Sequence, residues 1–272
     1  MLHIADWYVQ PDGHRVHYRS IGEGGRALVF LHGLGCNLDL WRLQAPVLKE
    51  YGRLLFIDLP GHGASDKPEI PYTVDLHVGA VKAVLDHAGI ERVIPVGHSM
   101  GGGIAYEFVR RHRSRCPALI WVDGAFAIPA QIDEQIAANR KRAADFRGPD
   151  GPGYIHEFVE SMFTASTPAA VREEIHAAML QTPAHVLASC LEGLVERSLF
   201  NLDRLDIPVL ALFCRFWKPE PWLDLFRSYL PQIEIHLLDD VGHYPMLEAP
   251  DAVNAALVEF LHSVRSATTG ST

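Results

Sequence analysis

The stretch from Val93 to Ala105 constrains the fold more than any other part of the chain. It reads as a short apolar strand, then Gly97-His98-Ser99-Met100-Gly101, then the start of a helix. A turn from strand to helix within so few residues strains the backbone at its apex and crowds it against neighbouring chain, which favours glycine two residues on either side. The apex residue, Ser99, would lie at the helix N-terminus, where free N–H groups favour developing negative charge. The pattern predicts that Ser99 is a nucleophile.

Apolar runs alternate with helical patterns along most of the chain, which indicates the fold class. Runs typical of buried strands cover residues 27–31, 54–57, 93–96, 118–122 and 208–213, and a further strand is predicted at 233–238. This alternation predicts an α/β fold in which helices flank a mostly parallel sheet. Reactive groups of such sheets gather at the carboxyl ends of the strands. The Leu34 loop, Ser99, Asp123 and His243 all follow predicted strands, so we expect them at one edge of the sheet.

The character of the sequence changes between about residue 126 and residue 205. Strand-like runs disappear there, and charged or alanine-rich helical stretches are separated by glycine and proline. We interpret this region as a helical insertion over the active site. The prediction is a core of residues 1–125 and 206–272 with a helical lid, or cap, at residues 126–205.

Charge and cysteine usage narrow the functional classes. The net charge of −9 over 272 residues argues against a nucleic-acid partner and gives no basic surface for anionic lipid. No apolar run is long enough to span a bilayer, and the N-terminus lacks the basic start and apolar core of a signal peptide. Four scattered cysteines fit reduced thiols. We expect a cytoplasmic monomer or homodimer that acts on a small molecule.

Several motifs together resemble the α/β hydrolases of the lid-bearing esterase, lactonase and epoxide-hydrolase-like kind, over nearly the whole chain. They are His32-Gly33, the loop from Asp58 to Ser65, Gly97 to Gly101, and Gly242-His243. The resemblance implies that Ser99 is the nucleophile, that His243 is the general base, and that the backbone N–H groups of Met100 and Leu34 form an oxyanion hole. A serine at the apex, where epoxide hydrolases have aspartate, favours acyl transfer through an acyl-enzyme. No metal or organic cofactor is expected.

Three polar residues in the turn-rich loops have a structural interpretation. His32 follows a predicted strand, and Asp58 and His62 belong to the same loop after the next one. Side chains in such loops usually hold the loop by hydrogen bonds. We therefore expect these residues to stabilise loops rather than to take part in catalysis.

The catalytic acid departs from the family pattern. The family usually places an aspartate just after the strand that follows the lid, but Cys214-Arg215-Phe216-Trp217-Lys218-Pro219 contains no carboxylate. Asp123, at the end of the strand after the nucleophile helix, is the first candidate, and Glu220 is the second. A site without an acid is the third possibility. A carboxylate is expected because His243 must hold one tautomer and become positively charged in the transition state.

The substrate is constrained only by aromatic residues near the predicted site. Trp41, Phe126 and Trp217 indicate an apolar acyl or alcohol group, although core packing explains each of them equally well. The prediction is a carboxylic ester hydrolase whose partner is a small-molecule ester or lactone. A lactonase or a C–C bond hydrolase on the same site is the first alternative. A ligand-binding, receptor-like protein on a hydrolase scaffold is the second, supported only by the unusual Arg215–Lys218 loop.

Overall fold

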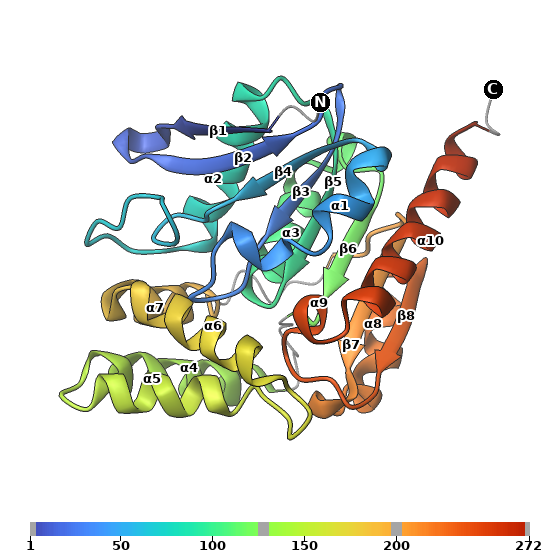
Figure 1. The fold of residues 1–272 in the computed structure, drawn as a ribbon. Helices are drawn as coiled ribbons and strands as arrows, with labels where there is room; N and C mark the ends of the chain where they lie inside the picture. The colour runs from blue at the N-terminus through green and yellow to red at the C-terminus, as the bar shows by residue number, and fades with distance from the viewer. Residues whose placement is uncertain (1–3, 125–130, 197–202, 270–272) are drawn as a thin grey trace.

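An eight-stranded sheet forms the centre of the molecule in the computed structural model, which describes residues 4–124, 131–196 and 203–269 (Figure 1). Its order is β1-β2-β4-β3-β5-β6-β7-β8. The pairs β1–β2 and β2–β4 are antiparallel and the other pairs are parallel, which confirms the mostly parallel α/β sheet. The strands are β1 (Ile4–Val9), β2 (Val16–Ile21), β3 (Arg26–Leu31), β4 (Arg53–Ile57), β5 (Arg92–His98), β6 (Leu119–Val122), β7 (Val209–Cys214) and β8 (Ile233–Leu238).

Helices cover both faces of this sheet. The short helix α1 packs against α10, and α2 packs against α3. Figure 1 shows α1 and α10 in front of the sheet and α2 and α3 behind it. The central strands are therefore buried on both sides, which explains their continuous apolar sequences. The bounds of these helices, and of the short helices α8 and α9, are α1 (Ala45–Leu48), α2 (Val74–His87), α3 (Met100–Arg111), α8 (Leu223–Tyr229), α9 (Pro245–Glu248) and α10 (Pro250–Thr269).

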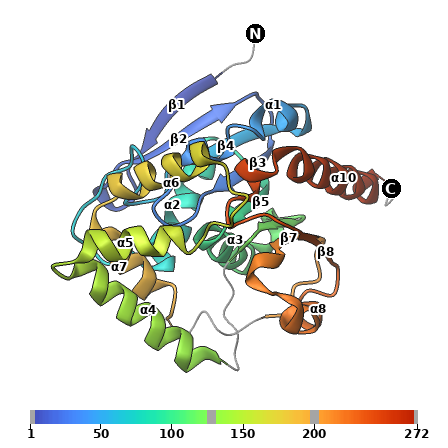
Figure 2. The same ribbon diagram turned by 60° about the horizontal axis from the view of Figure 1, so that its bottom comes forward.

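A group of helices lies between β6 and β7 in the chain, where the lid is predicted. They are α4 (Ile132–Arg147), α5 (Gly151–Glu160), α6 (Ala169–Gln181) and α7 (Ala184–Gly193). Helix α4 packs against α5 and α7, and α5 packs against α6. Figures 1 and 2 show the group together at the side of the sheet to which the parallel strands point. The start of the predicted insertion at residue 126 lies outside the described residues, and its role as a lid stays a prediction.

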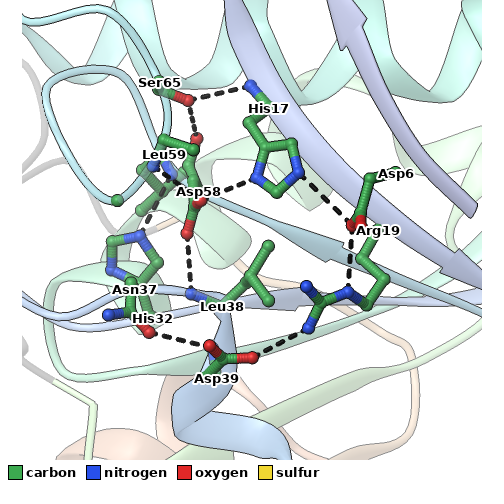
Figure 3. A network of polar contacts seen from close by, with 12 residues as sticks. Asp6, His17, Arg19, His32, Asn37, Leu38, Asp39, Asp58, Leu59 and Ser65 are labelled. Atoms are coloured by element: carbon green, nitrogen blue, oxygen red, sulfur yellow. Dashed lines mark hydrogen bonds and ion pairs between the residues drawn. The ribbon is translucent and has the colours of Figure 1, made fainter.

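A buried polar network holds the loops at this edge of the sheet (Figure 3). The Asp58 carboxylate accepts hydrogen bonds from the N–H groups of Leu38 and Ala64, at 2.8 and 2.9 Å, and contacts Nδ1 of His17 at 2.8 Å. His32 accepts a hydrogen bond at Nε2 from the N–H of Leu59. These contacts tie two loops and a strand together, and they agree with a structural role for Asp58 and His32.

Two global features bear on the sequence-based expectations. Within the described residues, no helix combines the length and the apolar character that crossing a membrane requires. All four cysteines are buried and carry free thiols. Burial raises the pKa of the Cys36 and Cys116 thiols to about 12, so neither is an activated nucleophile.

Candidate active site

Ser99 occupies the strained turn between β5 and α3. Its backbone lies in the left-handed region at φ 50°, directly before the first residue of the helix. A Cβ atom on Gly97 would lie 2.2 Å from the carbonyl oxygen of Gly101, and one on Gly101 would lie 2.2 Å from that of Leu31. Real Cβ atoms do not approach so closely, so both glycines are required for this turn. The crowding expected from the sequence is present.

The structure brings Ser99, His243 and Asp123 together in one line of hydrogen bonds. Nε2 of His243 lies 2.9 Å from Oγ of Ser99, and Nδ1 of His243 lies 2.6 Å from Oδ2 of Asp123. Because an ionised carboxylate can only accept, the bond to Asp123 places the proton on Nδ1. The lone pair on Nε2 then faces the serine hydroxyl, as a general base requires.

Asp123 owes its position to two neighbouring strands. It follows β6 directly, in the left-handed backbone region at φ 45°, and it is buried. Its other carboxylate oxygen, Oδ1, accepts a hydrogen bond of 2.9 Å from the N–H of Cys214, the last residue of β7. The backbone of His243 is held in turn, since its N–H donates to the carbonyl of Met162 at 2.9 Å. Backbone groups of neighbouring segments therefore hold both residues of the Asp123–His243 hydrogen bond in place.

The position after β7, where the family usually carries the acid, holds an indole. Nε1 of Trp217 lies 3.3 Å from Nδ1 of His243, with the two rings edge-on. Glu220, the second acid candidate, is exposed and paired with Arg215, which also binds Asp239 at 2.6 Å. Of the two candidate acids, only Asp123 contacts the histidine.

His98 is a functional residue that the sequence reasoning missed. Its Nε2 lies 2.7 Å from the carbonyl oxygen of His243, which can only accept, so Nε2 carries the proton. Burial, together with nearby His243, lowers the pKa of His98 well below 6.5 and keeps the ring neutral. His98 thereby ties the histidine loop to the end of β5. The partners are 145 residues apart in sequence, so no local signal could have revealed the contact.

A cavity of about 140 Å³ lies between the sheet and the α4–α7 helices. One wall comes from the carboxyl ends of the strands and includes Leu34 and Met100, the two predicted oxyanion residues. The other wall is largely apolar. The lining residues from this second wall are Asn139, Phe158, Met162, Leu191 and Leu194.

Comparison with known proteins settles the family. The sequence profile of the alpha/beta hydrolase family matches residues 28–256. The chain belongs to this family. A solved esterase from Thermogutta terrifontis is similar to this α/β hydrolase, with 25% identity, a TM-score of 0.83, and coverage of 96% of this chain and 99% of the other. A 2-hydroxy-6-oxononadienedioate/2-hydroxy-6-oxononatrienedioate hydrolase from Paraburkholderia phymatum is 29% identical over 91% of each chain.

Other matches show how varied the relatives of this α/β hydrolase are. The acetyltransferase component of an acetoin cleaving system from Cupriavidus necator is 39% identical over 98 residues, but the match spans only 26% of its length. Solved structures of similar fold include an epoxide hydrolase and an enzyme that degrades N-acyl homoserine lactones. Membership of this family therefore shows that the protein is a hydrolase, but it does not identify the bond that is cleaved.

The three aromatic residues predicted to contact substrate have different positions in this α/β hydrolase. Trp41 is fully buried against Phe30, with ring centroids 5.4 Å apart, and the structure does not bring it to the cavity. Trp217 is 47% exposed and lies against His243. Phe126 lies outside the described residues. Core packing, the alternative explanation, accounts for Trp41.

Asn139 brings a polar group to the cavity wall that the sequence did not predict. It lies on α4, and its Oδ1 accepts a hydrogen bond of 3.1 Å from Nη1 of Arg142, whose guanidinium lies over the Phe158 ring. This bond fixes the orientation of the amide and leaves the NH₂ group as a donor. A polar residue on a largely polar helix gives no sequence signal of this role, because only the docking of α4 shows which face meets the cavity.

Proposed function

We propose that this α/β hydrolase cleaves carboxylic esters through an acyl-enzyme on Ser99. One observation carries the proposal: Oγ of Ser99, the imidazole of His243 and the carboxylate of Asp123 form a continuous hydrogen-bonded line at the wall of a cavity. A serine with an aligned base and an orienting carboxylate is the arrangement that nucleophilic acyl transfer needs.

The first half of the reaction forms the acyl-enzyme. Nε2 of His243 takes the proton of the Ser99 hydroxyl as Oγ attacks the ester carbonyl carbon. Asp123 stabilises the resulting imidazolium through Nδ1–H without itself becoming protonated. The tetrahedral intermediate then collapses, His243 returns its proton to the alcohol oxygen, and the C–O bond of the ester breaks. The alcohol leaves, and the acyl group remains on Oγ.

The second half returns the free enzyme. His243 takes a proton from a water molecule that attacks the acyl carbonyl carbon. The bond between this carbon and Oγ of Ser99 then breaks, His243 returns the proton to Oγ, and the carboxylic acid is released. The negative charge in both halves develops on the former carbonyl oxygen. We assign its stabilisation to the backbone N–H groups of Met100 and Leu34, because both residues line the cavity and the amide of Met100 opens α3 without an intrahelical acceptor. The steps require no cofactor.

Three alternatives use the same site. A lactone is a cyclic ester and would follow the same steps, and a lactone-degrading enzyme shares the fold at 25% identity with a TM-score of 0.80. The relative that hydrolyses a dienedioate makes C–C bond cleavage the next candidate. A receptor-like protein would bind a ligand in the cavity without turnover.

Hydrolysis of p-nitrophenyl esters from acetate to octanoate, with γ- and δ-lactones alongside, tests the proposal. We expect ester turnover by the wild type, a rapid initial release of nitrophenol from the acyl-enzyme step, and loss of both in Ser99→Ala. Turnover of lactones in preference to esters would make the protein a lactonase. Ester and lactone rates equal to those of Ser99→Ala would refute the proposal, and a ligand that then raised the unfolding temperature would point to the receptor-like alternative.

A further inference from the structure

Three side chains on α5 and α6 converge at the surface, apart from the Ser99 cavity. They are His156, Glu160 and His176, of which the first two are exposed and the third is half-buried. Their potential ligand atoms all lie within 4.8 Å of one another. No other cluster of this kind, with three or more histidine, cysteine or acidic groups, occurs in the part of the chain that the structure describes.

The backbone places these groups for chelation. His156 and Glu160 are four positions apart on α5, so their side chains leave the same face of the helix. His176 comes from α6, which packs against α5, and its ring stacks on that of His156 with centroids 4.5 Å apart. The cluster therefore joins two helices, and its geometry depends on their packing.

The separations of these atoms fit a tetrahedral ion. Zinc binds imidazole nitrogen and carboxylate oxygen at about 2.1 Å, which puts neighbouring ligand atoms roughly 3.4 Å apart. Nε2 of His176 lies 2.6 Å from Oε1 of Glu160, and the most distant pair in the cluster lies within 4.8 Å. The required spacing falls between these two values, so small side-chain rotations admit an ion.

The carboxylate already has a second partner that fixes its direction. Nη1 of Arg172 contacts the other oxygen of Glu160, Oε2, at 3.1 Å, while the same guanidinium is bonded to the carbonyls of Thr164 and Thr167. Carboxylates that ligate metals are generally held in this way by an outer partner. Arg172 adds positive charge nearby, which weakens cation binding, but it leaves Oε1 directed toward the histidines.

We propose that His156, Glu160 and His176 bind a divalent transition-metal ion, zinc in preference to others, which ties α5 to α6. Two imidazoles and one carboxylate are a donor set that zinc accepts, whereas magnesium and calcium require oxygen ligands. Three protein ligands leave the fourth tetrahedral position to water. This site is additional to the proposed ester hydrolysis and does not depend on it.

The ion would stabilise a segment that holds the active-site histidine. The turn after α5 carries Met162, whose carbonyl accepts the N–H of His243. Between α5 and α6, Thr167 donates a hydrogen bond of 2.6 Å to Glu248, just beyond the histidine loop. An ion that fixes α5 against α6 therefore fixes the contacts on which the position of His243 depends.

Calorimetric titration of the tag-free full-length protein with zinc chloride tests the site, together with thermal unfolding at increasing zinc concentration. The variants are His156→Ala, Glu160→Gln and His176→Gln. His236→Ala is the matched control, because His236 lies 2.6 Å from Glu234 in the same kind of exposed pair but belongs to no three-ligand cluster among the described residues.

We expect about one zinc ion per chain in the wild type and in the control, with affinity reduced roughly tenfold or more in each of the three variants. Saturating zinc should raise the unfolding temperature of the wild type by roughly 2–5 °C and leave that of the variants unchanged. Equal binding by wild type and all variants would place the ion elsewhere, and no binding by wild type would leave no metal site; either result overturns the proposal. Neither readout requires ester turnover.

Discussion

The substitution Asp123→Asn tests the proposed chemistry most sharply, because the structure fixes how the new amide would lie. Oδ1 of Asp123 accepts the N–H of Cys214 at 2.9 Å, so the amide oxygen takes that place and the NH₂ group points at His243. An NH₂ group donates where the carboxylate accepted. It therefore binds the unprotonated form of Nδ1 and moves the imidazole proton to Nε2, which faces Ser99.

The neighbouring indole works in the same direction. The N–H of Trp217 lies 3.3 Å from Nδ1 and can be accepted only when that nitrogen carries no proton. With Asp123 in place, its charge holds the proton on Nδ1. Without that charge, two donors face Nδ1 and both stabilise the tautomer that cannot act as a base toward Ser99. A wrong tautomer in a Ser-His-Asp site lowers kcat by about 10⁴-fold, about 5 kcal/mol of transition-state stabilisation.

The assay is p-nitrophenyl ester hydrolysis, with kcat and KM measured separately. We expect kcat to fall by about 10³- to 10⁴-fold in Asp123→Asn while KM changes little, because the carboxylate lies behind the histidine and does not line the cavity. Glu220→Gln is the control, since Glu220 is exposed and paired with Arg215, and its rate should stay within about twofold of wild type. A loss below tenfold in Asp123→Asn would refute the tautomer argument, and a large loss in Glu220→Gln would reassign the acid.

Three further changes have outcomes that follow from single contacts. Gly97→Ala should destabilise the fold by roughly 3 kcal/mol or more in urea unfolding, because its Cβ meets the backbone of Gly101. Gly79→Ala is the control: its Cβ meets open space in α2, so it should stabilise the fold by roughly 0.5–1 kcal/mol. Equal effects of the two substitutions would contradict the crowding argument. Burial lowers the pKa of His77 from 6.5 to about 3, so between these values only the unfolded chain binds this proton and the stability of the fold falls as the pH drops. His77→Gln should therefore reduce the slope of unfolding free energy against pH by about 1.4 kcal/mol per pH unit between pH 6 and 4. An unchanged slope would contradict the lowered pKa of His77. Asn139→Leu removes the NH₂ donor from the cavity wall. It should lower the ratio of kcat/KM for p-nitrophenyl methoxyacetate to kcat/KM for p-nitrophenyl butanoate by about 2- to 10-fold, which corresponds to one neutral hydrogen bond. An unchanged ratio would mean that this amide does not contact the acyl chain.

The sheet was predictable because its signals are local. The central strands are marked by continuous apolar runs, and the strand predicted at 233–238 coincides with β8 at the edge of the sheet. Helix α2 has an equally local signal, since Thr73 stands directly before it and caps it by accepting the N–H of Leu76. The short helices α8 and α9 were missed, because seven and four residues carry too little periodicity to separate a helix from a turn.

The parts of the site that escaped prediction depend on packing between distant segments. The motif around Ser99 requires a particular backbone and therefore appears in sequence. In contrast, the partner of the His98 ring is a carbonyl at residue 243, and the cavity face of Asn139 is set by how α4 docks. The sequence left Asp123 and Glu220 both possible as the acid, since either loop could reach the histidine, with a site without an acid as the third possibility. Only the relative positions of the β6 and β7 ends distinguish them.

The residues at the end of β7 and after it contact the carboxylate and the histidine instead of supplying the acid. This explains how a chain without the usual carboxylate can still align its histidine. β6 and β7 are adjacent and parallel, with Val122 opposite Leu212, so their ends lie side by side under the imidazole. β6 supplies the carboxylate of Asp123. β7 supplies the N–H of Cys214 that orients this carboxylate, followed by an indole against the edge of the His243 ring. The carboxylate follows one strand, and the N–H group that orients it belongs to the next. The two strands together therefore align the histidine, whereas in the family the strand after the lid usually supplies the acid alone.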